Sequence, residues 1–233
     1  MEIIKQPHIT FIGDIDGKRI LRKLEDSGRK CWQTDAKEDS SEQFVGKIIG
    51  RGHTSVLEHE IFTCDIITDR GVMSELTRHR IASYSIESTR YVKYNGRMQF
   101  IKPVEFCKDP YDEKTPDDYE LELIWENSCR ESEIAYISML SYGAKPELAR
   151  QVLNNSLKTE IRFTINMRSA RNFFDLRCDV AAHPHMKQIA IPMLLFLQEK
   201  VPVLFDDIKY DKKFADKYLK NWRDMVSVKE IGG

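Results

Sequence analysis

The stretch formed by residues 157–168 alternates between apolar and polar side chains, with Thr159 as the one polar residue at an apolar position. Successive side chains of a β-strand point to opposite faces of a sheet, so this alternation predicts a strand with one buried and one strongly polar face. The apolar positions are Leu157, Ile161, Phe163, Ile165 and Met167. Such a strand requires a sheet that is covered on one side, and the polar side is then left to solvent or to a partner.

Helix signals elsewhere in the chain predict the elements that cover this sheet. Asp16 is expected to cap one helix, and Ser40 with Gln43 resembles the capping box of a second. Thr115 followed by Pro116 is typical of a helix start and begins the longest expected helix. Further helices are expected at residues 71–80, 169–176 and 184–200 and from residue 146, and strands at residues 8–15, 60–68 and 84–94. We therefore predict an α+β fold with a central antiparallel or mixed sheet flanked by helices.

A chain of 233 residues is long enough to close one hydrophobic core without disulfides or a structural metal. We expect a single domain over residues 1–233, of which the charged residues 212–233 form a peripheral tail. The 36 Lys and Arg nearly balance the 37 Asp and Glu, which argues against general attraction to nucleic acid or to an anionic membrane. No transmembrane or secretory segment is recognised, and the five scattered cysteines contain no zinc-binding pair, so we expect a cytoplasmic protein without a metal.

Positive charge nevertheless concentrates in two segments, residues 78–97 and 145–177, which we call the basic segments. A guanidinium group binds phosphate through bidentate, charge-assisted hydrogen bonds and never loses its proton, so the two segments indicate an anion site. Serine and threonine hydroxyls follow the first arginines closely, at Ser83, Ser85, Ser88 and Thr89. The competing interpretation is that the arginines only pair with the acidic segment of residues 105–133.

The order of motifs resembles the flavin-dependent thymidylate synthases. Arg78, His79 and Arg80, then seven residues, then Ser88 reproduce the signature of that family. Further matching blocks follow in the family's order: residues 52–59, Arg90 with Tyr91, residues 147–150, residues 166–168, Asn172, and Leu176 with Arg177. The resemblance spans residues 52–184, which is more than half of the chain.

The resemblance implies the synthesis of dTMP from dUMP, with methylenetetrahydrofolate as carbon donor, FAD as cofactor and NADPH as reductant. It further implies a homotetramer whose sites are shared between subunits. The implied FAD contacts are His53, Ser55, Arg78, His79, Arg80, Asn166, Arg168 and Asn172. The implied dUMP contacts are Glu75, Arg78, Ser88, Thr89, Arg90, Arg150 and Arg177.

Arg177 is the residue to which the resemblance assigns catalysis. Neither basic segment contains a cysteine, and Cys178, directly after the second segment, has no histidine immediately beside it to form a thiolate pair. Uracil must then be activated without a thiol, and a positive charge close to the ring favours loss of its N3 proton. The resulting anionic ring is the better carbon nucleophile at C5.

Three residues depart from the family's pattern. Glu75 stands where glutamine is frequent, Ile86 where a polar residue is usual, and His185 where an acidic residue often follows Pro184. A carboxylate at Glu75 would repel a nucleotide phosphate, so a dUMP contact at this position requires that it accept hydrogen bonds from the base or the ribose.

Two other classes of protein remain open at this point. A metal hydrolase would use His53, His59, Asp179, His183 and His185. A nucleic-acid-binding module would combine the arginines with Tyr84, Tyr91, Tyr94 and Phe100 as stacking platforms.

Overall fold

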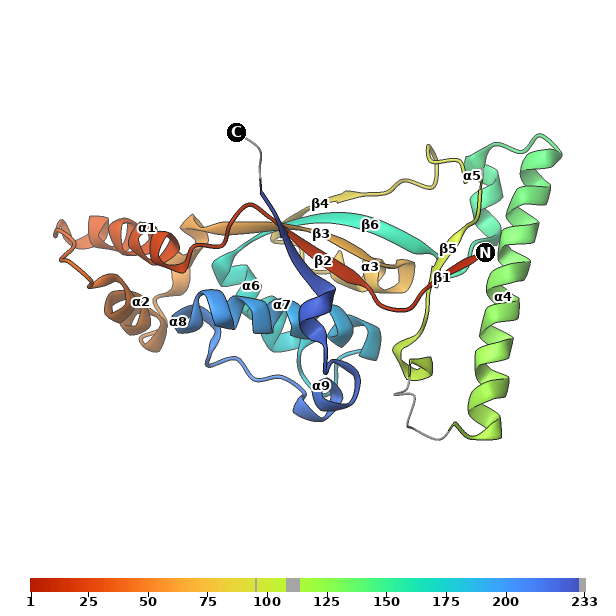
Figure 1. Cartoon of the computed structure of the whole chain (residues 1–233). Coiled ribbons are helices and arrows are strands. Elements are labelled where there is room, and N and C mark those ends of the chain that lie inside the picture. The colour runs from red at the N-terminus through yellow and green to blue at the C-terminus, as the bar shows by residue number, and fades with distance from the viewer. Residues whose placement is uncertain (95, 108–113, 231–233) are drawn as a thin grey trace.

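The computed structural model describes residues 1–94, 96–107 and 114–230. Its centre is a five-stranded sheet in the order β4-β6-β3-β2-β7 (Figure 1). The strands are β2 (His8–Ile12), β3 (Ile61–Asp69), β4 (Ala82–Ile86), β6 (Lys158–Asn166) and β7 (Val226–Lys229). All neighbours pair antiparallel except β2 and β7, which are parallel. The expected mixed central sheet is confirmed. A separate parallel pair joins β1 (Glu2–Ile4) to β5 (Gln99–Ile101).

Helices cover one face of the central sheet. In Figure 1, α3, α6 and α7 lie beneath the strands, whereas α1 and α2 lie at one end and the long α4 stands at the other. The helices are α1 (Gly17–Arg29), α2 (Ser41–Gly50), α3 (Arg70–Leu76), α4 (Pro116–Ser141), α5 (Pro146–Ala149), α6 (Met167–Arg177), α7 (Pro184–Lys200), α8 (Pro202–Phe205) and α9 (Lys212–Tyr218). Short 3-10 turns are η1 (Lys30–Trp32), η2 (Thr54–His59), η3 (Val104–Phe106), η4 (Arg150–Val152) and η5 (Trp222–Met225). Within the described parts of the chain, no helix is both long and apolar enough to span a bilayer.

The alternating stretch of residues 157–168 folds as the sequence predicts. Ile161, Phe163 and Ile165 of β6 are buried in the main core together with the apolar side chains of α6 and α7. Leu157 is buried in a smaller second core, which α4 closes through Cys129 and Tyr136. Burial of each large apolar side chain stabilises the fold by roughly 1.5–3 kcal/mol. Because Leu157 and β6 place such side chains in both cores, this stretch connects the two cores.

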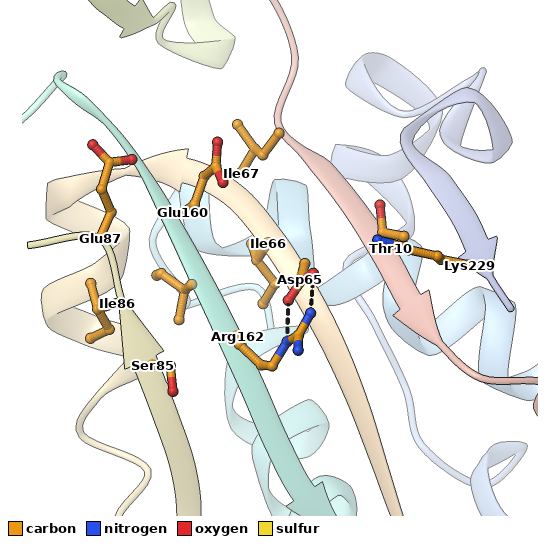
Figure 2. A pocket seen from close by; sticks show the side chains of 11 residues that line it. Thr10, Asp65, Ile66, Ile67, Ser85, Ile86, Glu87, Glu160, Arg162 and Lys229 are labelled. Atoms are coloured by element: carbon orange, nitrogen blue, oxygen red, sulfur yellow. Dashed lines mark hydrogen bonds and ion pairs between the residues drawn. The ribbon is translucent and has the colours of Figure 1, made fainter. Parts of the chain in front are cut away.

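The opposite face of the sheet is polar. Asp65 of β3 accepts two hydrogen bonds from Arg162 of β6, at 2.7 and 2.8 Å (Figure 2). Thr63 and Thr164 share a hydrogen bond of 2.8 Å between the same two strands. These cross-strand pairs satisfy the polar side chains that period-two alternation sends away from the helices.

The predicted peripheral tail is wrong for residues 212–230. Strand β7 pairs with β2 along the edge of the central sheet, and Phe214, Leu219 and Met225 are buried in the main core. The charged residues between these positions suggested a solvated segment, but the few apolar side chains anchor it. Residues 231–233 lie outside the described residues.

Two local predictions are also corrected. The strand expected over residues 84–94 ends at Ile86, and the chain then turns: the amides of Tyr91 and Val92 both donate to the carbonyl oxygen of Ser88. Ser40 does not cap α2, because its hydroxyl donates to Glu25 at 2.6 Å instead. The caps expected at Asp16 and Thr115 are confirmed.

Candidate active site

A groove of about 730 Å³ opens where α6 meets η2 and the chain between α3 and β4. It brings together residues of both basic segments. Six predicted site residues line it: Arg78, His79, Arg80, Arg168, Asn172 and Arg177. Helix α6 follows β6 directly, and residues 77–81 connect α3 to β4. Because β4 pairs with β6, these two segments, about 90 residues apart in sequence, lie at the same end of the sheet.

Arg177, the last residue of α6, has three partners in this groove. Its Nε donates to Nε2 of His79 at 2.8 Å, and its Nη1 lies 3.1 Å from a carboxylate oxygen of Glu75. Its Nη2 donates to the backbone carbonyl of Glu75 at 3.3 Å. The edge of the His79 ring in turn packs on Phe173. The guanidinium is therefore held in a fixed position before any ligand binds.

His79 is neutral in this arrangement. Burial, together with the nearby charge of Arg177, lowers its pKa to about 4. A neutral imidazole can accept the hydrogen bond from Arg177, whereas a protonated ring has only donors. The lowered pKa and the accepted hydrogen bond thus both indicate an unprotonated His79 ring at neutral pH.

The remaining flavin candidates surround the groove at different depths. Arg168 pairs with Glu58 of η2 at 2.5 Å. Asn166 caps α6 by accepting a hydrogen bond from the amide of Ser169 at 2.8 Å, and it lines an adjoining hollow. His53 and Ser55 do not line the groove; they are exposed at the start of η2, the same short turn that carries Glu58.

The groove fits a flavin nucleotide by the chemistry of its lining. Four arginines offer donors and positive charge for a pyrophosphate: Arg78, Arg80, Arg168 and Arg177. Two exposed apolar side chains, Ile81 (73% exposed) and Leu176 (54% exposed), border the same space and suit an aromatic ring system.

The dUMP candidates fall into two groups in one protomer. Glu75, Arg78 and Arg177 belong to the groove. The other four are Ser88, Thr89, Arg90 and Arg150, and we call them the turn cluster. They lie beyond the opposite end of β4, whose five residues span about 17 Å.

Within the turn cluster, Thr89 is buried and its hydroxyl accepts a hydrogen bond from Arg150 at 3.4 Å. The Ser88 hydroxyl accepts from the amide of Arg90 at 3.3 Å. The Arg90 guanidinium lies over the ring of Tyr91, 5.2 Å from its centroid. The cluster thus presents two guanidinium groups and two hydroxyls around one tight turn.

Within the described residues, the ion pairs of the second basic segment do not involve the acidic segment, whereas the charge of Arg97 in the first segment helps to lower the pKa of Glu133. Arginines of the second basic segment form ion pairs with Glu58, Asp65, Glu75 and Asp207. In α4, Glu122 pairs with Lys102 and Lys114, and Glu133 with the N-terminal ammonium group. The ion pairs of Glu122 and Glu133 lie outside the groove, where Arg168 and Arg177 pair with Glu58 and Glu75 instead.

The metal site that a hydrolase would need does not form among the described residues, and only part of the stacking surface of a nucleic-acid-binding module is available. His185 is bound by carboxylates, with Nδ1 at 3.1 Å from Asp69 and Nε2 at 3.2 Å from Glu105. Within the described residues, no group of three or more His, Cys, Asp or Glu is arranged to hold a metal ion. Of the four expected stacking platforms, Phe100 is fully buried and Tyr84 already stacks on Phe163, whereas Tyr91 is 77% exposed.

The three departures from the family's pattern each have a structural explanation. Glu75 accepts a hydrogen bond from Arg177, so its charge is balanced. Ile86 packs against the main core. Burial opposes the charge on His185, but the hydrogen bonds to Asp69 and Glu105 outweigh it and raise its pKa to about 9.

Two features were missed at the level of sequence. Glu58 lies in a block that supports the family resemblance, but nothing in the spacing pairs it with Arg168, 110 residues later. Phe173, which packs on His79, is an ordinary apolar helix residue in the sequence.

Cys178 is buried, and its burial raises the pKa of the thiol, with a further contribution from Asp175. This thiol is no nucleophile, as the chemistry without cysteine requires.

The α+β fold of this chain is shared with a protein of known structure. The crystal structure of a UMP/dUMP methylase, PolB from Streptomyces cacaoi bound with 5-Br UMP, superposes with a TM-score of 0.74 over 88% of this chain and 95% of that chain. At 18% sequence identity this likeness establishes the fold alone.

Sequence comparison supplies the family. Residues 18–203 match the family described as "Thymidylate synthase complementing protein". A flavin-dependent thymidylate synthase from Geobacter sulfurreducens is 34% identical over 70% of this chain and 68% of its own length. The one from Pyrococcus furiosus is 33% identical over 79% of this chain and 73% of its own length. The chain belongs to this family of flavin-dependent thymidylate synthases.

Proposed function

We propose that this protein converts dUMP to dTMP by reductive methylation of uracil C5. FAD is the cofactor, and methylenetetrahydrofolate and NADPH are the co-substrates that supply carbon and reducing equivalents. The observation that carries the proposal is Arg177, held between neutral His79 and Glu75 in an arginine-lined groove of a chain of this family. When bound, FAD supplies the redox chemistry of the reaction.

The groove residues hold the cofactor in this proposal. Arg78, His79, Arg80, Arg168 and Asn172 contact it directly from the groove lining. Asn166, Ser55 and His53 complete the contacts from the adjoining hollow and from η2. The Arg168–Glu58 pair supports this assignment because it fixes one wall of the groove to η2.

Arg177 activates the uracil ring. A guanidinium next to the pyrimidine favours loss of the N3 proton, since the opposite charge stabilises the anion. Its rigid hydrogen bonds to His79 and Glu75 lower the cost of reorganisation during the reaction, which is the condition for large electrostatic stabilisation. His79 stays neutral and does not add a second charge that would compete for the anion.

The turn cluster binds the phosphate of dUMP, and a second copy of the chain brings it to the groove. One protomer holds the two groups at opposite ends of β4. Large apolar side chains are exposed beside both groups, including Ile81 and Leu176 at the groove and Tyr91 (77% exposed) at the turn. Exposed apolar surface of this kind marks association surfaces, which supports a homotetramer with shared sites.

We further propose one domain over residues 1–233 and a cytoplasmic location. The N-terminal strand β2 and the C-terminal strand β7 are neighbours in one sheet, which supports a single folding unit. Free cysteines at Cys31, Cys64, Cys107, Cys129 and Cys178 support a reducing compartment.

The purified protein tests the reaction directly. We expect a yellow protein with a flavin spectrum, and tritium release from dUMP labelled at C5 that depends on methylenetetrahydrofolate. A colourless protein that releases no tritium with FAD, NADPH and the folate present contradicts the proposal.

Mixing two defective variants, assayed at dUMP concentrations below the Michaelis constant, tests the shared site. In the proposed tetramer, R177A and R90A damage different halves of each site, so mixed oligomers contain some sites with both arginines. We expect activity to return after the two variants are dissociated and reassembled together, and light scattering to give the mass of a tetramer. No recovery in oligomers proven to be mixed contradicts sharing.

A further inference from the structure

A partly buried polar bridge lies directly next to the turn cluster. Glu87, the residue before Ser88, accepts a hydrogen bond from the Tyr94 hydroxyl at 2.5 Å and lies 3.2 Å from the ammonium group of Lys158. The side chains of Glu87 and Lys158 are each only 14% exposed. We refer to Glu87, Tyr94 and Lys158 as the bridge.

The bridge encloses the turn on both sides. Glu87 precedes Ser88, and Tyr94 comes three residues after Tyr91. The amides of Tyr91 and Val92 donate to the Ser88 carbonyl at 3.1 and 2.9 Å, which closes the turn itself. A single carboxylate therefore ties the entry of the turn to its exit.

Each member of the bridge is anchored in a different part of the fold. The Glu87 amide donates to the carbonyl of Glu160 at 2.9 Å, which continues the pairing of β4 with β6. Lys158 begins β6. Tyr94 packs in the second core, where its ring contacts that of Tyr136 with centroids 5.7 Å apart. Through these contacts the turn is anchored both to the central sheet, by Lys158, and to α4, by Tyr136.

The electrostatics of the bridge favour the charged pair. Burial raises the pKa of Tyr94, and its hydrogen bond to Glu87 adds to the shift, so the phenol remains a donor. Burial opposes the charge on Lys158, but the hydrogen bonds to Glu160 and Glu87 outweigh it and raise its pKa. Carboxylate, phenol and ammonium therefore form one satisfied network at neutral pH.

We propose that Glu87, Tyr94 and Lys158 are positioning residues that fix the turn cluster for the phosphate of dUMP. The inference rests on the proposed function in taking dUMP as the ligand. None of the three side chains needs to touch the nucleotide. They place the Arg90 and Thr89 groups before binding, so that the turn loses little conformational freedom when phosphate arrives.

Glu87→Gln is the sharpest test, and Glu160→Gln is its matched control. Glutamine keeps an acceptor for Tyr94 but presents an amide donor to the ammonium of Lys158. Glu160 lies on β6, the strand next to Glu87 (Figure 2), and also pairs with Lys158 of its own strand, but its side chain is 60% exposed and it forms no side-chain hydrogen bond to the described residues of the turn. Both variants remove one carboxylate from the same lysine, but only E87Q alters the group that binds Tyr94 at the exit of the turn.

We expect E87Q to weaken dUMP binding, measured by calorimetry on the flavin-loaded protein, by about tenfold, the size of one buried charge-assisted hydrogen bond. Deoxyuridine, which lacks the phosphate, should bind E87Q and wild type alike. The Michaelis constant for dUMP should rise while the turnover number at saturation stays within about twofold. E160Q should match wild type, and Y94F, which keeps the ring packing, should show a smaller loss than E87Q.

Amide hydrogen exchange separates this inference from the proposed function. We expect the Tyr91 and Val92 amides to exchange faster in E87Q than in E160Q without any ligand, with the same flavin content and thermal midpoint. If wild type binds no dUMP, the proposed function fails while exchange still reports on the bridge. Equal dUMP affinity in E87Q and E160Q, or equal exchange at the two amides, overturns the inference.

Discussion

The two ends of β4 hold their arginines in different surroundings. At the groove, Arg177 and Arg168 each pair with a carboxylate, from Glu75 and Glu58. At the turn cluster, Arg150 donates to the neutral hydroxyl of Thr89 and Arg90 lies over an aromatic ring. Among the residues that the structure describes, neither of these two arginines has an acidic partner.

This difference matches the part of dUMP that each end is proposed to bind. A phosphate carries its charge before it binds, so unpaired guanidinium groups suit it. The uracil ring becomes anionic only during activation, so a guanidinium that is already positioned by fixed partners suits the groove. The two ends therefore separate binding from activation, and the following variants test that separation.

The largest effect is expected from Arg177→Ala. Loss of the positioned guanidinium should reduce dTMP formation by about 10³-fold, because electrostatic stabilisation of the ring anion disappears. Flavin should stay bound, since other groove residues hold it, and its absorbance measures this. Arg223→Ala, at an exposed ion pair with Glu199, is the control and should keep full activity. Normal turnover in R177A refutes the role assigned to this residue.

Arg150→Met should act on binding instead. We expect the Michaelis constant for dUMP to rise by about 100-fold while the turnover number changes far less, because a charge-assisted phosphate contact contributes about 1.5–3 kcal/mol. Steady-state kinetics at several salt concentrations measures the effect. The exposed Arg130 of α4 provides a control arginine. A fall in turnover number with an unchanged Michaelis constant would place Arg150 in the chemistry and remove the contrast between the two ends.

Glu75→Gln tests how far the Glu75 carboxylate reduces the effect of the Arg177 charge on the N3 pKa of the bound ring. Removing one negative charge next to the guanidinium should lower the N3 pKa of bound 5-fluoro-dUMP by about one unit. The ultraviolet spectrum of the bound ring, titrated with pH, measures that value without turnover. Glu58→Gln, which releases Arg168 instead, should leave it unchanged. An unchanged N3 pKa in E75Q means that Glu75 leaves Arg177 when the nucleotide binds.

Two histidines extend the comparison to stability. His79 at the groove has a pKa lowered to about 4, so the unfolded chain takes up a proton between about pH 6.5 and 4 that the folded chain refuses. His185 contacts Asp69, at the other end of the sheet, and has a pKa raised to about 9. The folded chain therefore retains a proton there that the unfolded chain loses above about pH 6.5.

The free energy of unfolding should consequently fall toward acid because of His79 and toward alkali because of His185. Urea unfolding at pH 5, 7 and 8.5 measures both slopes. H79Q should flatten the acid side only, and H185Q the alkaline side only. Equal slopes in H185Q and wild type between pH 7 and 8.5 would contradict a charged His185.

Ser88→Ala should give the smallest change. Its hydroxyl accepts one long hydrogen bond from the Arg90 amide, so its loss should raise the Michaelis constant for dUMP by only a few-fold, about 1 kcal/mol or less. Ser85→Ala on the open sheet face is the control. Complete loss of activity with intact dUMP binding would instead give Ser88 a part in the chemistry.

Local structure was predictable from the sequence where one pattern dominated. The alternation in residues 158–166 gave β6 with its buried and polar faces, and the Thr115 cap marked the start of α4. Prediction failed where the deciding contact lay far along the chain. Strand β7 forms because β2 offers an edge more than 200 residues away, and Ser40 turns from α2 to Glu25 because α1 packs beside it.

The candidate site divides in the same way. The motif order identified the family and named the groove arginines, because residue type and spacing are local properties. Tertiary structure alone decided that Arg177 meets His79 and Glu75 and that Arg150 meets Thr89. These contacts follow from sheet register and helix packing, which bring residues 61 to 102 positions apart within hydrogen-bond distance. Charge in a sequence states how many ions a chain carries, whereas the fold decides which of them neutralise one another and which remain for a ligand.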